Sequence, residues 1–172
     1  HKEDATMGDV NNPRIWAGAE VFKAPLDTAA PASPTATPSG TWESAGLLSE
    51  DAGITESREE EVTDHFAQGP DEVLLVRTTR TKHKRSFAFV AAEDNAVVFA
   101  LINPGSEVET ASGLTTRTVK APQPAPASYL IRQKDGSVVR QLHVHRGEVT
   151  EVGDIETPPG EMAVKELTVT VY

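Results

Sequence analysis

Apolar residues in this chain mostly alternate with polar ones or form short runs, a pattern that predicts β-strands. Lys134-Asp135-Gly136 lies between two such segments, and Asp-Gly is a strong signal for a β-hairpin turn. We expect strands over residues 14–24, 72–81, 83–92, 115–120, 128–133, 137–146, 148–156 and 162–171.

One segment has helical periodicity. Its apolar stripe lies at Val97, Val98, Leu101 and Ile102, and Asn103-Pro104-Gly105 follows as a stop signal. Asp94 is the expected N-cap. Phe87 and Phe89 share one face of the preceding strand, so we expect this helix to pack over them.

An apolar run and a basic run follow one another after Gly69-Pro70-Asp71. Residues 73–76 are apolar on both faces, which predicts a buried strand segment. Basic residues then dominate as far as residue 85, where they could contact phosphates or form a polar strand end. The basic residues are Arg77, Arg80, Lys82, His83, Lys84 and Arg85.

A polar ribbon precedes these strands. Thr55 to Val62 alternates side chains on two faces, and both faces carry charges that are costly to bury without partners. The absence of a helical stripe favours an extended conformation. A second copy of the chain would explain such a segment by covering it, with Glu59, Glu60 and Glu61 facing the basic edge of the neighbour.

The chain is expected to hold one domain. Residues 1–12 form an N-terminal arm and residues 13–172 a single β-domain. Within it, residues 25–40 form a Pro-rich loop and residues 47–64 an extended arm between subunits. No C-terminal immunoglobulin-like domain is expected.

Composition supports a mainly β fold, a β-sandwich or barrel-like domain with one short α-helix and long extended loops. Val and Thr number 18 each against 10 Leu. The net charge of −10 argues against general affinity for nucleic acid or an anionic membrane. Cysteine is absent, which excludes thiolate chemistry and disulfides. No apolar run is long enough to span a bilayer, and synthesis in the cytoplasm is expected.

Catalytic motifs are weak. His143 and His145 on one strand, with Glu148 beyond them, loosely resemble the metal motif of cupins, but the spacing differs and no later histidine completes the set. No Gly-x-Ser-x-Gly elbow is present, and no pair of carboxylates has an apolar setting that would separate their pKa values. We therefore expect a protein that is not an enzyme, with no catalytic residue, metal or cofactor.

Two segments carry a family resemblance. Trp42-x-x-x-Gly46-Leu47-Leu48-Ser49-Glu50-Asp51-x-Gly53-Ile54 and the polar ribbon after it resemble the N-terminal half of bacteriophage major tail tube proteins. The segment from Asn11 to Pro25 resembles the opening strand of these proteins in phages of actinobacteria. The sharp matches are confined to residues 11–62.

The resemblance implies a structural virion protein of the phage tail, made in the host cytoplasm. Its copies would form hexameric rings that stack into a tube around the tape-measure protein and would later conduct DNA as transient cargo. Tail terminator and distal tail proteins are the other implied partners, with no membrane involved. Intersubunit contacts are expected at Leu47, Leu48, Glu50, Asp51, Ile54, Glu56, Arg58, Glu59, Glu60, Glu61, Arg77, Arg80 and Lys82.

Two alternatives remain open from the residues. Another ring-forming tail or baseplate protein, such as a terminator or spike component, would share the fold but form only one ring. A cupin-like metal-dependent enzyme would use His143, His145 and Glu148.

Overall fold

A computed structural model of the chain describes residues 13–38 and 40–172, so the expected arm over residues 1–12 lies outside the described residues. Seven antiparallel strands form one sheet in the order β2-β1-β7-β8-β9-β4-β3, and β5 and β6 form a separate hairpin. The mainly β class is thereby confirmed. The elements are β1 (Gly18–Ala24), β2 (Glu43–Ser44), β3 (Thr55–Gln68), β4 (Val73–Ala91), α1 (Ala96–Ile102), β5 (Glu107–Ala111), β6 (Leu114–Thr118), β7 (Ala127–Asp135), β8 (Val138–Val152) and β9 (Lys165–Val171).

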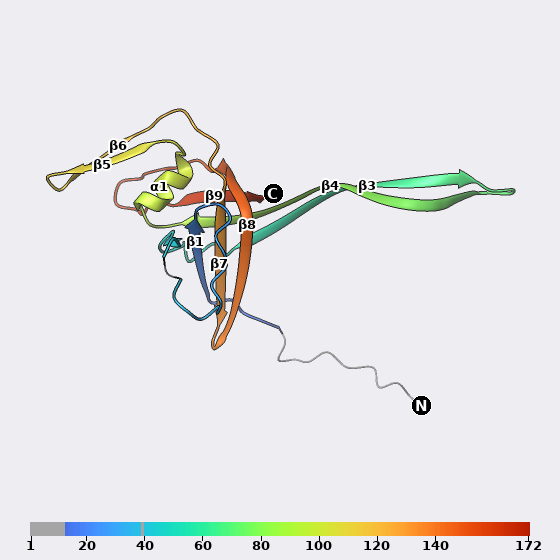
Figure 1. Cartoon of the computed structure of the whole chain (residues 1–172), viewed down its shortest axis with the longest axis horizontal. Helices are drawn as coiled ribbons and strands as arrows, with labels where there is room; N and C mark the ends of the chain where they lie inside the picture. Colours follow the sequence, from blue (N-terminus) through green and yellow to red (C-terminus); the bar gives the residue numbers. More distant parts are fainter. Residues whose placement is uncertain (1–12, 39) are drawn as a thin grey trace.

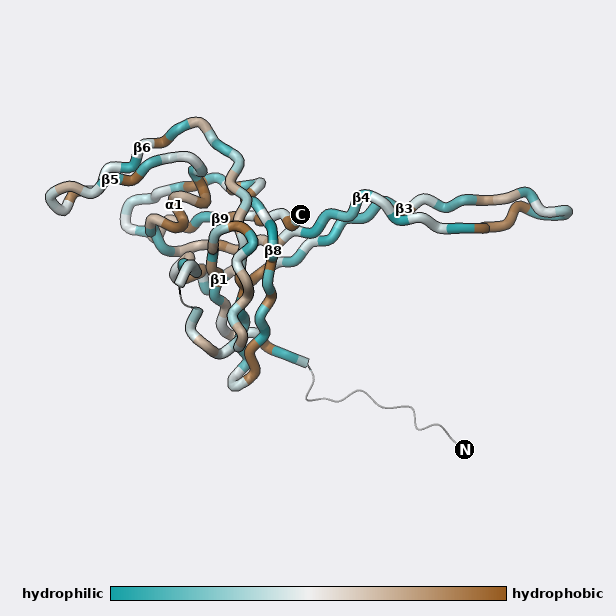
Figure 2. Tube along the Cα trace, viewed as in Figure 1, coloured by the Kyte–Doolittle hydropathy of each residue, from teal (hydrophilic) through white to brown (hydrophobic). Residues whose placement is uncertain are grey.

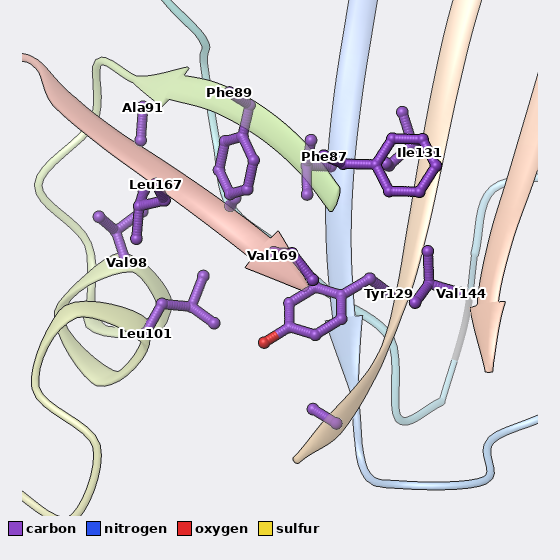
Figure 3. Close-up of a cluster of buried hydrophobic side chains, with 13 residues drawn as sticks. Phe87, Phe89, Ala91, Val98, Leu101, Tyr129, Ile131, Val144, Leu167 and Val169 are labelled. Carbon is purple, nitrogen blue, oxygen red and sulfur yellow. The ribbon is translucent and has the colours of Figure 1, made fainter. Parts of the chain in front are cut away.

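The large sheet curls around a single core. In Figure 1, β1, β7 and β8 run upright, whereas β4 and β9 run across them. Both halves of the sheet contribute to one buried cluster, which α1 covers on one side (Figure 3). The arrangement is sandwich-like, although the layers belong to one continuous sheet. The buried residues of this cluster include Val21, Phe87, Phe89, Val98, Leu101, Tyr129, Ile131, Val144, Leu167 and Val169.

Helix α1 forms where the apolar stripe predicted it. Val98 and Leu101 are buried, and Val97 and Ile102 pack against the core from its edge. The expected cap is wrong by one residue, because the Asn95 side chain accepts the hydrogen bond from Val98 N at 2.9 Å. Asp94 instead pairs with Arg117 of β6 at 2.6 Å and so links the helix start to the β5–β6 hairpin.

Two pairs of predicted strands are in fact single long strands. Residues 137–146 and 148–156 merge into β8, which pairs with β7 up to Gly147 and with β9 from Gly147 to Val152. Gly147 is buried at this corner, where an added Cβ would lie 2.9 Å from Val169 Cγ1. The glycine therefore lets the strand turn between partners without ending it.

Strand β4 likewise joins the two segments expected at 72–81 and 83–92. The expected break at Lys82 is a β-bulge, in which Lys82 and His83 lie opposite Glu60. Lys82 has φ +53, a left-handed conformation typical of bulges. Residues 14–17 are not a strand, and the last strand begins at Lys165 rather than at residue 162.

Candidate assembly surfaces

The most prominent feature is the β3–β4 hairpin, which projects far from the body (Figure 1). Its turn contains Gly69-Pro70-Asp71 and is closed by a hydrogen bond from Gly69 N to Glu72 O of 2.7 Å. Beyond β3, only residues 85–91 of β4 have a second strand partner, β9. All fourteen residues of β3 are exposed, so the ribbon has no buried face in the described chain.

Charged side chains cross-link the inner half of this hairpin. The Glu56 carboxylate binds Arg58 at 2.8 Å and Arg85 at 2.7 Å, although the two arginines face one another across the strands. The hydrogen bond from Arg58 is the main reason that the pKa of Glu56 lies below its ordinary value. Desolvation opposes this lowering, and attraction to both arginines adds to it. Glu56 therefore keeps two like charges together at the root of the ribbon.

The next acidic residues also pair inside the same hairpin. Glu60 contacts Arg80 at 3.7 Å and His83 Nδ1 at 3.3 Å, and Glu61 pairs with Lys82. These acids already have basic partners on the adjacent strand of the same chain, so the expected pairing with a neighbouring copy stays a prediction. Such exposed pairs each contribute little, but together they favour one register of an otherwise marginal two-stranded ribbon.

The outer half of the hairpin carries exposed apolar side chains on both of its faces. Phe66 lies directly opposite Leu75, and Gln68 opposite Val73. The expectation that residues 73–76 are buried is wrong, since their exposed fractions range from 47% to 65%. Phe66 is 62% exposed and Val62 55%. Figure 2 shows the resulting hydrophobic bands on both strands near the hairpin end.

The segment 47–54, expected as part of the same arm, folds back on the body instead. Ser49 N donates to Val90 O and Ala92 N donates to Leu47 O, both at 2.9 Å, so the segment runs beside the inner end of β4. Gly46 makes this approach possible: its φ is +81, and an added Cβ would lie 2.2 Å from Glu93 Oε2. The Glu93 carboxylate in turn accepts from Leu47 N at 3.0 Å.

This segment forms one wall of a cleft of about 850 Å³. The opposite wall is the start of β1, which pairs with β2 only through Phe22 and Lys23 and leaves the edge of residues 18–20 uncovered by a strand. The lining includes the predicted contact residues Leu47, Leu48, Glu50 and Ile54, together with Trp16, Glu20 and Glu93. Asp51 lies outside this lining, beside the start of β3.

The two histidines of the cupin-like pattern hold the Pro-rich loop. His143 Nε2 is 3.0 Å from Thr28 O, and His145 Nε2 is 2.9 Å from Asp27 Oδ1. Glu148 instead accepts a hydrogen bond from Ala125 N at 3.0 Å. Within residues 13–38 and 40–172, no three His, Asp or Glu side chains are grouped to hold a metal ion.

A buried arginine fixes the same loop and was missed in the sequence. Arg132 is 4% exposed, and its guanidinium donates to Ala36 O, to Ser33 O and to Gln141 Oε1. Backbone carbonyls of a loop leave no side-chain pattern that a sequence could reveal. The described part of the loop over residues 25–38 therefore covers the β7–β8 face.

The structure thus separates the predicted contact residues into two surfaces. The acidic and basic residues from Glu56 to Lys82 lie on the hairpin, whereas Leu47, Leu48, Glu50 and Ile54 line the cleft. The sequence pattern did not reveal that the apolar residues Val62, Phe66 and 73–76 are exposed on the hairpin. The available signal was an apolar run placed between a turn and a basic run, which is unusual for a core strand.

Comparison with known families identifies the chain. The family model for phage tail tube proteins matches residues 7–172, nearly the whole sequence. No curated protein matches the sequence closely enough to count as a relative. None of the helices in the described residues is long and apolar enough to cross a membrane. The match covers both surfaces described above, and the chain belongs to the phage tail tube protein family, whose members are structural components of the virion tail.

Proposed function

We propose that this chain forms the phage tail tube from hexameric rings that stack along one axis, with the β3–β4 hairpin as the arm between copies. The observation that carries the proposal is the projecting ribbon, whose outer end has apolar side chains that the described chain leaves exposed. Exposed apolar surface of this kind marks an interaction site. A family of self-assembling tail proteins makes another copy the natural partner.

The tube would house the tape-measure protein and later conduct DNA to the host. With a net charge of −10 per chain, an acidic lumen would repel phosphate backbones, so DNA would pass without binding. Tail terminator and distal tail proteins would close the two ends. A role as a terminator or spike component differs from this proposal in forming a single ring.

Deletion of the outer hairpin tests the proposal. Residues 62–80 are replaced by Asn-Gly, which joins Glu61 to its cross-strand partner Thr81 through a tight turn. No buried core residue lies in this segment, so the variant should remain folded by circular dichroism. Electron microscopy of the concentrated wild-type protein should show long tubes, and the variant should show none. Tubes formed by the variant, or isolated rings formed by the wild type, would contradict the proposal.

A further inference from the structure

The outer part of β4 has one strand edge that is free. Strand β3 covers one side of β4 from Val73 to Ala88, whereas β9 covers the other side only over Arg85–Ala91. Residues 73–84 therefore present backbone N–H and C=O groups that no strand pairs in the described chain. Along this edge four apolar residues precede Arg77 and Arg80, so the edge is apolar and then basic.

The cleft beside β1 has the matching properties. Its apolar lining includes Leu47, which is 71% exposed, and the partly buried Trp16 and Ile54. Glu20 and Glu50 are exposed acidic residues in the same lining. The uncovered edge of residues 18–20 supplies backbone groups for an added strand.

The two surfaces of one chain are too far apart to meet. Ile54 lies in the cleft and immediately precedes β3, so the cleft is at the root of the hairpin. The fourteen residues of β3 extend about 45 Å from that root. The ribbon points away from the body (Figure 1), so its outer end can reach only the cleft of another molecule.

From these observations we infer that the outer edge of β4 in one copy, over residues 73–80, enters the cleft of a second copy and adds a strand beside β1. The apolar residues 73–76 contact Leu47 and Ile54 there, and Arg77 and Arg80 approach Glu20 and Glu50. Because donor and acceptor are different surfaces, each copy binds one neighbour and is bound by another, and the contact propagates. The inference rests on the proposed function, since it names the partner surface of the same hairpin.

Cysteine cross-linking tests this contact, because the chain has no cysteine of its own. One preparation carries Leu75→Cys, and a second carries Leu47→Cys with a fusion tag that separates the disulfide products by mass. The two are mixed under assembly conditions and oxidised with copper–phenanthroline. A disulfide requires Cα atoms within about 7 Å, so it reports direct contact. The matched control replaces Leu47→Cys by Leu114→Cys, which is 76% exposed on the β5–β6 hairpin.

The expected result is a mixed disulfide between positions 75 and 47 at a yield at least about tenfold above the control pair. Equal yields for the two pairs, or tubes without the 75–47 disulfide, would overturn the inference. Electron microscopy of the same samples separates this outcome from failure of the proposed function. Tubes that form without the disulfide would reject only the contact between β4 and the cleft. The disulfide without tubes would support that contact and reject the proposed tube.

Discussion

The two ends of β4 are similar in hydropathy and opposite in burial. At the inner end Phe87, Phe89 and Ala91 are 0–3% exposed, whereas at the outer end residues 73–76 are 47–65% exposed. The inner end has β9 along one side, β3 and then residues 47–49 along the other, and α1 against its inward face. The outer end has only β3 beside it. Burial within the chain therefore depends on what neighbours the strand, not on its apolar content.

Apolar residues therefore have different roles at the two ends of β4. Apolar side chains at the inner end stabilise the subunit by leaving water on folding. Those at the outer end keep about half or more of their surface exposed in the single chain, and burial of that surface is available to stabilise association. The predictions below test this division, beginning with the largest expected effect.

Truncation of the inner aromatic residue should destabilise the monomer severely. Phe89→Ala removes a side chain that is 2% exposed and should cost about 3–5 kcal/mol of unfolding free energy. Leu75→Ala at the outer end should change the same quantity by no more than about 0.5 kcal/mol. Urea unfolding followed by circular dichroism measures both. Equal destabilisation by the two substitutions would remove the distinction between the ends.

Polar substitution of the outer apolar pair should act on assembly alone. Phe66→Ser with Leu75→Ser should leave the unfolding midpoint unchanged, because both residues are exposed in the single chain. Tube formation, measured by sedimentation and electron microscopy, should fall at least about tenfold, since every lost 1.4 kcal/mol of contact weakens association tenfold. The control is Thr63→Ser with Thr79→Ser, a cross-strand pair on the opposite face. A comparable loss in the control would mean that the apolar pair has no special role.

One wall of the cleft depends on Gly46, which belongs to the segment that resembles tail tube proteins. Gly46→Ala forces a side chain into a left-handed conformation and against Glu93. The loss of unfolding free energy should exceed that caused by Gly40→Ala by about 1–3 kcal/mol, because Gly40 has a similar φ of +75 but open space around it. Thermal unfolding of the two variants provides the comparison. Equal costs would show that the wall moves freely away from Glu93.

The smallest effect concerns the root of the hairpin. The pKa of Glu56 lies below its ordinary value of 4.5, so its contribution to stability is complete above that pH and is lost as the pH falls through the lowered pKa. Below pH 4.5 the wild type should therefore lose hairpin order that Glu56→Gln already lacks at neutral pH. Carboxyl chemical shifts in a pH titration measure the pKa directly. An unshifted midpoint for Glu56 would contradict the bridging role between Arg58 and Arg85.

The sequence predicted the parts of the fold that follow from local pattern. The helix stripe at Val98 and Leu101, the Asp-Gly hairpin and the burial of Phe87 and Phe89 are each properties of a few adjacent residues. The strand breaks predicted at Lys82 and Gly147 are wrong. Pairing with neighbouring strands continues β4 through a bulge and β8 through a corner.

The expected contact residues stay a prediction, and their arrangement in the structure could not be foreseen from the sequence. Glu60 and Lys82 were both expected in contacts between copies, yet their partners lie across one hairpin, a fact set by strand register that charge alone does not encode. Residues 73–76 read as core because a sequence cannot state which strand lies on either side of them. Nor could the sequence show that Arg132 holds the Pro-rich loop, because backbone carbonyls of the loop accept its hydrogen bonds.

The central claim, that the outer end of β4 becomes buried only in the assembly, is tested most directly by amide hydrogen exchange in the monomer and in the tube. We predict that amides of residues 73–80 exchange at least about tenfold more slowly in the tube, because the free edge gains hydrogen bonds there. Amides of residues 85–91, which already have β9 on one side and β3 or residues 47–49 on the other, should exchange at similar rates in both states. Equal exchange of residues 73–80 in monomer and tube would contradict the account.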